Sequence, residues 1–170
     1  MKKRGVYTIP PYPGWSNQQL TKNTGLVPYL LHKNYGFHAV MAGSKVESAY
    51  PNAEYINGVD LVFFQDDFLG SRLEFIRENA EDMDLFILHG PDSNYVPMIR
   101  CYREVRPDGK IYLELDPNSY WMDRIQWDTE DFRYMLSQCN VIGSSGRKMQ
   151  SILSRKWPCK IEYLPNGFYN

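Results

Sequence analysis

The chain has 170 residues, of which 43% are hydrophobic and 23% charged, and its formal net charge is −1. This length fits a single domain, and the balanced charge argues against the clustered Lys and Arg surface that nucleic-acid binding requires. No run approaches the ~20 apolar residues of a membrane-spanning helix, and the apolar stretch after the basic residues 1–4 is too short for a signal peptide. The three cysteines, Cys101, Cys139 and Cys159, are widely spaced, which predicts reduced, cytosolic thiols.

Apolar runs of strand length alternate along the chain with segments of helical spacing. The expected strands are residues 5–9, 38–42, 59–64, 84–88, 111–115, a strand starting at 141–142, and 161–164. The expected helices are residues 24–34, 71–81 with Ser71 as cap, 95–105, 128–138 and 146–156. Strands that are apolar on both faces indicate an open, doubly wound, mostly parallel Rossmann-like α/β sheet of about six to seven strands, with helices on both faces.

Ligands of such sheets bind at the carboxyl ends of the strands, so the residues that follow each strand are the candidates. The loop after the first strand carries Tyr12 and Trp15, which could form an aromatic platform for a sugar or could pack the loop down. Asn23, Thr24 and Gly25 follow, at the start of the next helix. Their backbone N–H groups could bind a phosphate, or Asn23 or Thr24 could simply cap the helix. The chain has no GxGxxG and no GxxxxGK[ST] motif, which argues against ordinary dinucleotide or P-loop binding.

The fourth and fifth strands end in residues with acid–base chemistry. His89 directly follows an apolar strand, and Gly90 leaves room for close approach, so His89 is a candidate site residue as well as a candidate structural histidine. Glu114 and Asp116 lie on the same side of the fifth strand, as paired carboxylates for acid–base or metal chemistry do. The alternative is that Asp116 begins an Asx-Pro turn and Glu114 pairs with a lysine. Asn118, Tyr120 and Trp121 would line the same cleft.

Small residues follow the sixth strand, where Ser144 and Ser145 precede a helix. They form either an anion site or a simple serine cap. Two further carboxylate pairs, Asp66 with Asp67 and Asp82 with Asp84, resemble metal ligands, but solvated or capping roles are the expectation for both. The remaining histidines, His32 and His38, flank the end of a helix and are interpreted as scaffold.

Taken together, these motifs resemble the N-terminal domain of a GT-B fold glycosyltransferase, most similar to glycosyltransferase family 4. The resemblance covers nearly the whole chain in order, and it closes on a strand that ends in a Pro-Asn-Gly turn. The segments that carry it are residues 24–31, 35–40, 84–89, 110–116, 140–145 and 161–167.

The resemblance implies a two-domain enzyme that moves a sugar from a nucleotide-sugar to a glycan or lipid-linked acceptor, usually with retention and without a bound metal or other cofactor. Residues 1–170 would be its acceptor-binding half, in a polysaccharide pathway, and would not transfer sugar without the donor domain. Carried over by position, His89 and Asp116 are the expected catalytic residues, facing the transferred sugar. The expected donor-phosphate residues are Asn23, Thr24, Gly25, Ser144 and Ser145, and the expected acceptor-binding residues are Tyr12, Trp15, Asn118, Tyr120 and Trp121.

Other functions stay open at this point. The chain could be a stand-alone Rossmann-like sugar-binding or partner subunit without catalysis of its own, whose natural product ends near Asn170. A two-subunit transferase lies between these readings, and a small flavodoxin-like nucleotide enzyme fits less well. The expected location is cytoplasmic, at most with weak peripheral contact at the inner membrane face through residues 1–4 and the basic pairs at 147–148 and 155–156. An ordinary solvated basic face explains the same residues.

Overall fold

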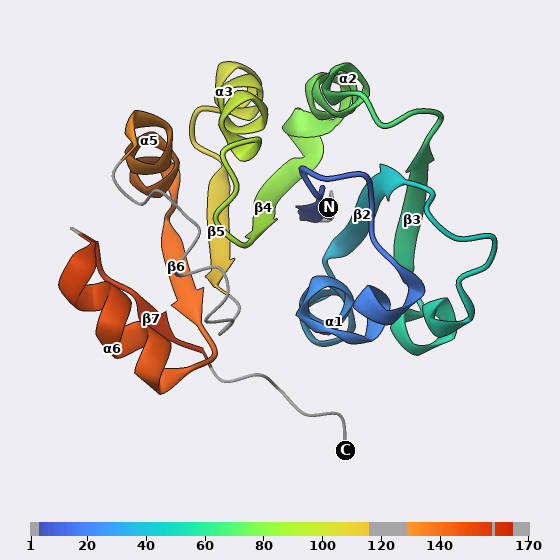
Figure 1. Cartoon of the computed structure of the whole chain (residues 1–170). Helices are drawn as coiled ribbons and strands as arrows, with labels where there is room; N and C mark the ends of the chain where they lie inside the picture. Colours follow the sequence, from blue (N-terminus) through green and yellow to red (C-terminus); the bar gives the residue numbers. More distant parts are fainter. Residues whose placement is uncertain (1–3, 116–128, 158, 165–170) are drawn as a thin grey trace.

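The computed structural model describes residues 4–115, 129–157 and 159–164, which form an α/β domain around one sheet (Figure 1). The strands are β1 Gly5–Thr8, β2 His38–Ser44, β3 Val59–Phe64, β4 Met83–His89, β5 Lys110–Leu115, β6 Val141–Ser144 and β7 Glu162–Tyr163. The helices are α1 Asn23–Tyr35, α2 Leu69–Asn79, α3 Tyr95–Val105, α5 Glu130–Gln138 and α6 Arg147–Lys156. Short 3-10 helices accompany them in the described residues: η1 Asn17–Thr21, η2 Pro51–Ile56 and η3 Ala80–Asp82.

The sheet has seven strands within the described residues, in the order β3-β2-β1-β4-β5-β6-β7, and every pair is parallel. The prediction of a doubly wound, parallel Rossmann-like sheet is therefore confirmed. The chain winds outward from β1 to β3, crosses over, and winds outward again from β4 to β7. The reversal between β1 and β4 is the topological switch point, where open α/β sheets bind their ligands at the carboxyl ends of the strands.

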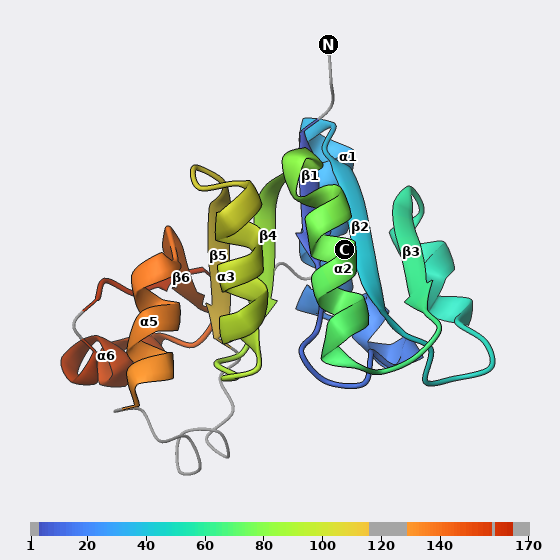
Figure 2. The same cartoon turned by 90° about the horizontal axis from the view of Figure 1, so that it is seen from above.

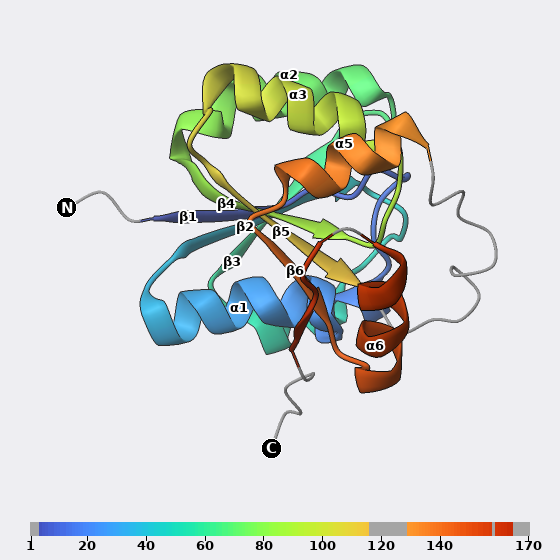
Figure 3. The ribbon, with the colours of Figure 1, turned by 90° about the vertical axis from the view of Figure 1, so that its left-hand side faces the viewer.

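Helices cover both faces of the sheet, as Figure 3 shows with α2, α3 and α5 on one side and α1 on the other. Helices α2 and α3 lie side by side across the first of these faces (Figure 2). The β1 strand shows that both faces of the sheet are buried. Tyr7 packs into the core under α2 and α3, while Val6 packs into the core under α1. Strand residues that are apolar at every position are what such a sheet requires.

Most predicted elements lie within a few residues of their observed bounds, but the loop predicted between β1 and α1 contains η1. Its first turn is closed by the Ser16 N–H, which donates to Oε1 of Gln19 at 2.7 Å. The turn then packs against α1 so closely that a Cβ at Gly25 would lie 2.0 Å from the carbonyl oxygen of Leu20. Glycine at this position is therefore explained by the close approach of two helical segments.

The prediction that Ser71 caps α2 is wrong, because the N-cap residue is Phe68 and Ser71 lies inside the helix. The Ser71 hydroxyl instead donates to Oδ1 of Asp66 at 2.6 Å, and the Phe68 N–H donates to the same oxygen at 3.0 Å. Asp66 therefore binds the N-cap residue and the first turn of α2 without itself serving as the cap. No helix in the described part of the chain is long and apolar enough to cross a membrane.

Candidate functional site

The register of the sheet brings His89 and Glu114 together at its carboxyl edge. His89 is the last residue of β4 and lies directly opposite Glu114 of β5, which in turn lies opposite Gly143 of β6. Gly90 then turns the chain with a φ of 78°, a left-handed conformation that favours glycine. Its N–H donates to the Glu114 carbonyl at 2.8 Å, so the main chain after β4 is fixed on β5.

The two side chains meet in a buried environment, with His89 exposed by 10% and Glu114 by 8%. Nδ1 of His89 lies 2.9 Å from Oε2 of Glu114. The approach is close but not aligned, because neither Oε2 of Glu114 nor Nε2 of His89 makes a hydrogen bond within the described residues. Buried polar atoms are normally paired, so an imidazole and a carboxylate with unused capacity indicate a place for a ligand or for ordered water.

Asn23 completes this cluster from the other side of the switch point. It is the first residue of α1, and its Nδ2 donates to Oε1 of Glu114. The alternative in which Glu114 pairs with a lysine is wrong, because its contacts are an amide and an imidazole. We refer to Asn23, His89 and Glu114 as the edge cluster; they come from three elements that converge at one point of the sheet edge.

Two tyrosines near the edge cluster, Tyr95 and Tyr112, have pKa values that are raised by burial. The His89 backbone N–H donates to the hydroxyl oxygen of Tyr95 at 3.1 Å. Burial, reinforced by nearby Tyr12, raises the pKa of Tyr95 well above the usual value, so this hydroxyl stays neutral. Burial also raises the pKa of Tyr112, two residues before Glu114, and the Glu114 charge adds to the effect.

The predicted phosphate contact through Gly25 does not fit the first turn of α1. The Gly25 N–H already donates to the carbonyl of Lys22 at 3.0 Å, and Lys22 is the N-cap residue. The alternative, a cap formed by Asn23 or Thr24, is also wrong, because both lie inside the helix. Thr24 is buried, and the Asn23 side chain is directed to Glu114.

The predicted aromatic platform separates into two different residues. Trp15 is fully buried, with its ring 5.5 Å from that of Tyr50 and 5.2 Å from that of Phe63, so it packs the loop onto the core and offers no surface to a sugar. Tyr12 is only partly buried, and its hydroxyl accepts a hydrogen bond from Nε2 of Gln19 at 3.3 Å. Of the two, Tyr12 is the one that keeps a polar tip near this edge.

Ser144 ends β6 and Ser145 follows it at the same edge, but neither caps α6, whose N-cap residue is Gly146. Ser144 is fully buried, and its hydroxyl accepts from the Gly146 N–H at 3.3 Å. Oγ of Ser145 is buried and makes no hydrogen bond in the described part of the chain. Four predicted site residues lie outside the described residues: Asp116, Asn118, Tyr120 and Trp121.

The pattern of unpaired atoms points to one edge of the sheet. Within the described residues, several buried side-chain atoms without a hydrogen bond lie near the carboxyl ends of strands or in the loops that follow them. They are Oγ1 of Thr8, Nε1 of Trp15, Nε2 of His89, Oε2 of Glu114 and Oγ of Ser145. Thr8 and His89 end β1 and β4, Glu114 is the residue before the last of β5, Ser145 follows β6, and Trp15 lies in the loop after β1.

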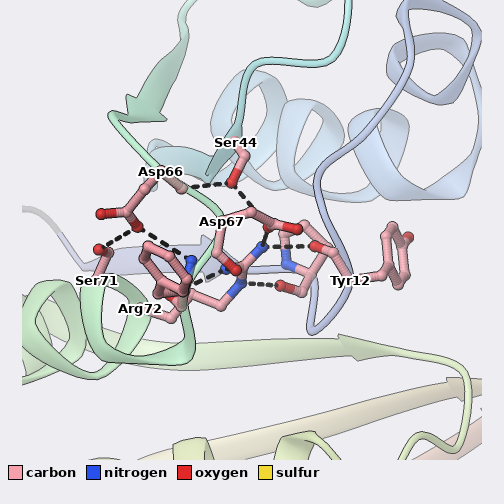
Figure 4. Close-up of polar contacts among 8 residues, drawn as sticks. Tyr12, Ser44, Asp66, Asp67, Ser71 and Arg72 are labelled. Carbon is pink, nitrogen blue, oxygen red and sulfur yellow. Dashed lines mark hydrogen bonds and ion pairs between the residues drawn. The ribbon is translucent and has the colours of Figure 1, made fainter.

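A buried arginine that sequence reasoning missed holds the loops of this edge together (Figure 4). Arg72 of α2 donates from Nε to the Pro10 carbonyl at 2.9 Å and from Nη2 to the Tyr12 carbonyl at 2.6 Å. The same Nη2 lies 2.6 Å from Oδ1 of Asp67, which explains Asp67 as a structural partner. In sequence, Arg72 lies four and eight residues before Ile76 and Ala80, on the apolar face of the predicted helix, and this position is the signal that could have marked its burial.

A comparison of the chain with models of known protein families finds no match, and neither does a comparison with curated proteins. Among the described residues, no group of three or more His, Cys, Asp or Glu side chains could hold a metal ion. The fold and the edge cluster therefore define the protein as a Rossmann-like α/β domain with a buried, polar, incompletely paired group of side chains at its switch point.

Proposed function

We propose that this chain is the acceptor-binding domain of a retaining, metal-independent glycosyltransferase, which moves a sugar from a nucleotide-sugar to a glycan or lipid-linked acceptor. The observation that carries the proposal is the edge cluster, in which buried His89 and Glu114 keep unused hydrogen-bonding capacity at the switch point. The ordered motifs that resemble glycosyltransferase family 4 add to it.

The chemistry of the edge cluster suits a neutral ligand rich in hydroxyl groups. A carboxylate oxygen accepts hydrogen bonds and an imidazole nitrogen can accept one, whereas a sugar hydroxyl both donates and accepts. Tyr12 would add an aromatic face with a polar tip, the combination that suits a sugar. A diphosphate beside Glu114 would suffer like-charge repulsion, so we place the donor phosphates away from the edge cluster.

The proposed enzyme requires a donor site that the described residues do not supply. The Gly25 N–H is engaged within α1, so the anion-binding capacity of that turn is reduced. A further domain or a partner chain would bind the nucleotide. The same observation favours a second candidate, a sugar-binding or partner subunit without catalysis of its own.

Ligand binding to the purified chain tests the proposal. Methyl glycosides and short oligosaccharides of common hexoses, and separately UDP, are titrated by calorimetry and by ligand-detected NMR. We expect sugars to bind and UDP to bind weakly or not at all. His89→Gln should weaken the sugar about tenfold, because a hydrogen bond contributes about 1 to 1.5 kcal/mol.

His38→Gln is the matched control, because His38 also contacts a carboxylate but lies exposed at the other end of the sheet. Unchanged sugar affinity in His89→Gln, or equal losses in both variants, would contradict the proposed site. Transfer of sugar from a nucleotide-sugar, once a donor domain or partner chain is supplied, separates the enzyme from the binding subunit.

A further inference from the structure

We infer that Glu114 and Asn23 are positioning residues, which fix the protonated nitrogen and the orientation of the His89 ring so that Nε2 accepts a hydrogen bond from the ligand. The identity of that ligand as a sugar rests on the proposed function, but the arrangement of the three side chains does not. None of the three side chains has a role fixed by fold alone, since a Rossmann-like sheet needs no charge at this position.

The two oxygens of Glu114 face two donors. Asn23 donates from Nδ2 to Oε1, and Nδ1 of His89 lies 2.9 Å from Oε2. An ionised carboxylate only accepts hydrogen bonds, so Nδ1 is the nitrogen that carries the proton in the neutral ring. Nε2, on the opposite side of the ring, is then left with its lone pair as an acceptor.

Both side chains of this contact keep an atom without a hydrogen bond. Oε2 of Glu114 and Nε2 of His89 are buried and make no hydrogen bond among the described residues. A small rotation of the ring would align Nδ1–H with Oε2, and a ligand hydroxyl that donates to Nε2 would hold it there. Hydrogen bonds of catalytic histidines are often misaligned without ligand and tighten when it binds.

The main chain at His89 does not depend on the Glu114 carboxylate. The His89 N–H donates to Tyr95, and the Gly90 N–H donates to the Glu114 carbonyl. The β4–β5 pairing holds the remaining backbone in register. The Glu114 side chain is therefore not needed to hold the backbone. Because it is buried between two donors, we assign it the role of orienting the His89 ring.

A second histidine–carboxylate pair provides an internal control. Nε2 of His38 lies 2.7 Å from Oδ2 of Asp60, with side-chain exposures of 44% and 65%. Here the contact uses Nε2 instead of Nδ1, so the two histidines are expected to favour opposite tautomers. The pair lies at the start of β2 and the second residue of β3, at the amino end of the strands.

The test is a long-range ¹H–¹⁵N correlation spectrum of the full chain labelled in histidine, recorded at a pH where the rings are neutral. We expect His89 to be protonated at Nδ1 and His38 to be protonated mainly at Nε2. Glu114→Gln should remove the preference of the His89 ring for protonation at Nδ1, because a glutamine must present its NH₂ group to one of the two donors. Asn23→Ala leaves the carboxylate in place and should weaken the preference by a smaller amount.

Glu114→Asp should restore part of the Nδ1 preference, and Asp60→Asn should leave His89 unchanged. Protonation of His89 at Nε2 in the unmodified chain would overturn the inference, and this measurement needs no variant to fold. An unchanged tautomer in both Glu114→Gln and Asn23→Ala, with native amide spectra, would also overturn it. If the tautomers behave as expected but no sugar binds, the proposed function fails and the positioning role stands.

For sugar binding, we expect Glu114→Gln to lower the affinity about tenfold while the melting temperature stays close to that of the unmodified chain. A parallel fall in melting temperature and affinity would identify a merely structural role and count against the inference.

Discussion

The two edges of the sheet handle their polar side chains in opposite ways. At the amino edge, Asp84 accepts from the Gly5 N–H at 2.8 Å and from Nη2 of Arg106 at 2.6 Å, using both carboxylate oxygens. At the carboxyl edge, Glu114 satisfies one oxygen with Asn23 and leaves the other without a hydrogen bond. Carboxylate oxygens are therefore fully used at the amino edge, whereas at the carboxyl edge one of them makes no hydrogen bond among the described residues.

Poorly held loops do not explain the unpaired atoms at the carboxyl edge, because an arginine side chain binds main-chain carbonyls at each edge of the sheet. Arg103 donates to the carbonyls of Gly109 and Gln138 at 2.6 and 2.8 Å near the amino edge. Arg72 does the same for Pro10 and Tyr12 at the carboxyl edge. Each edge therefore has an arginine that binds main-chain carbonyls among the described residues, so the unpaired atoms of His89 and Glu114 are a local feature.

The largest effect is expected when the Arg72 clamp is removed. Arg72→Met leaves the Pro10 and Tyr12 carbonyls without these donors and removes the charged partner of Asp67, and it should lower the free energy of unfolding by about 3 kcal/mol or more. Arg103→Met, whose guanidinium is less buried, should lower it by about 1 to 2 kcal/mol. Urea denaturation measures both.

Sugar titration distinguishes the two arginines. Only Arg72→Met is expected to displace the loop that carries Tyr12, so only this variant should lose sugar affinity. Equal losses of sugar affinity in the two arginine variants would show that the edges differ less than their hydrogen bonds indicate.

The next effect concerns two glycines in helices. Gly25→Ala would place a Cβ 2.0 Å from the Leu20 carbonyl oxygen, so we expect a loss of about 1 to 3 kcal/mol in unfolding free energy. Gly70 in α2 has open space around its Cβ position, so Gly70→Ala should stabilise by about 0.5 to 1 kcal/mol. Thermal melts of the two variants test this prediction. A Gly25→Ala variant with unchanged melting temperature would contradict the close packing of η1 on α1.

The two carboxylates give the most direct test of the contrast between the edges. Asp84→Asn should lower the free energy of unfolding by about 1 to 2 kcal/mol because Arg106 loses a charged partner, and sugar affinity should not change. Glu114→Gln should change the free energy of unfolding by less than about 1 kcal/mol, since it removes a carboxylate that is only partly paired. Both are read by urea denaturation and sugar titration, and the reverse outcome would assign the structural role to Glu114.

The fold could be predicted because its signals are local. Residues 84–88 are apolar on nearly every position and lie between helical segments, which is the mark of a strand buried on both faces. The 3-10 segments were missed because η1 lies in a stretch rich in proline and polar residues, where no hydrophobic period stands out. Trp15 shows the same limit, because nothing in its neighbours distinguishes a packed ring from a ligand platform.

The edge cluster could be predicted only in part because its contacts are long-range. His89 and Glu114 were found from their place at strand ends, but their contact depends on the register of β4 against β5. Asn23 is 91 positions from Glu114 in sequence, and their hydrogen bond requires the fold that brings the start of α1 to the carboxyl end of β5. Arg72 was missed because most of its partners are backbone carbonyls, which leave no trace in the sequence.

The smallest effect separates two tyrosines of α3 that both pack against Phe86, at ring distances of 6.4 Å for Tyr95 and 5.6 Å for Tyr102. The Tyr102 hydroxyl donates to the Met83 carbonyl at 2.6 Å at the amino edge, whereas the Tyr95 hydroxyl accepts from His89. Each change to Phe should lower the unfolding free energy by about 1 kcal/mol near neutral pH, and only Tyr95→Phe should also weaken sugar binding.

The pH dependence gives a further distinction at the amino edge. Burial raises the pKa of Tyr102 to about 12, so folding favours the neutral hydroxyl. Its contribution is complete below the value of an unfolded tyrosine, about pH 10, and is lost as the pH rises toward 12. Tyr102→Phe should therefore flatten the fall in melting temperature over this range, while His38→Gln should leave it unchanged. A fall as steep in Tyr102→Phe as in the unmodified chain would assign the alkaline sensitivity to another group, with Tyr95, whose pKa is also raised by burial, as the next to change.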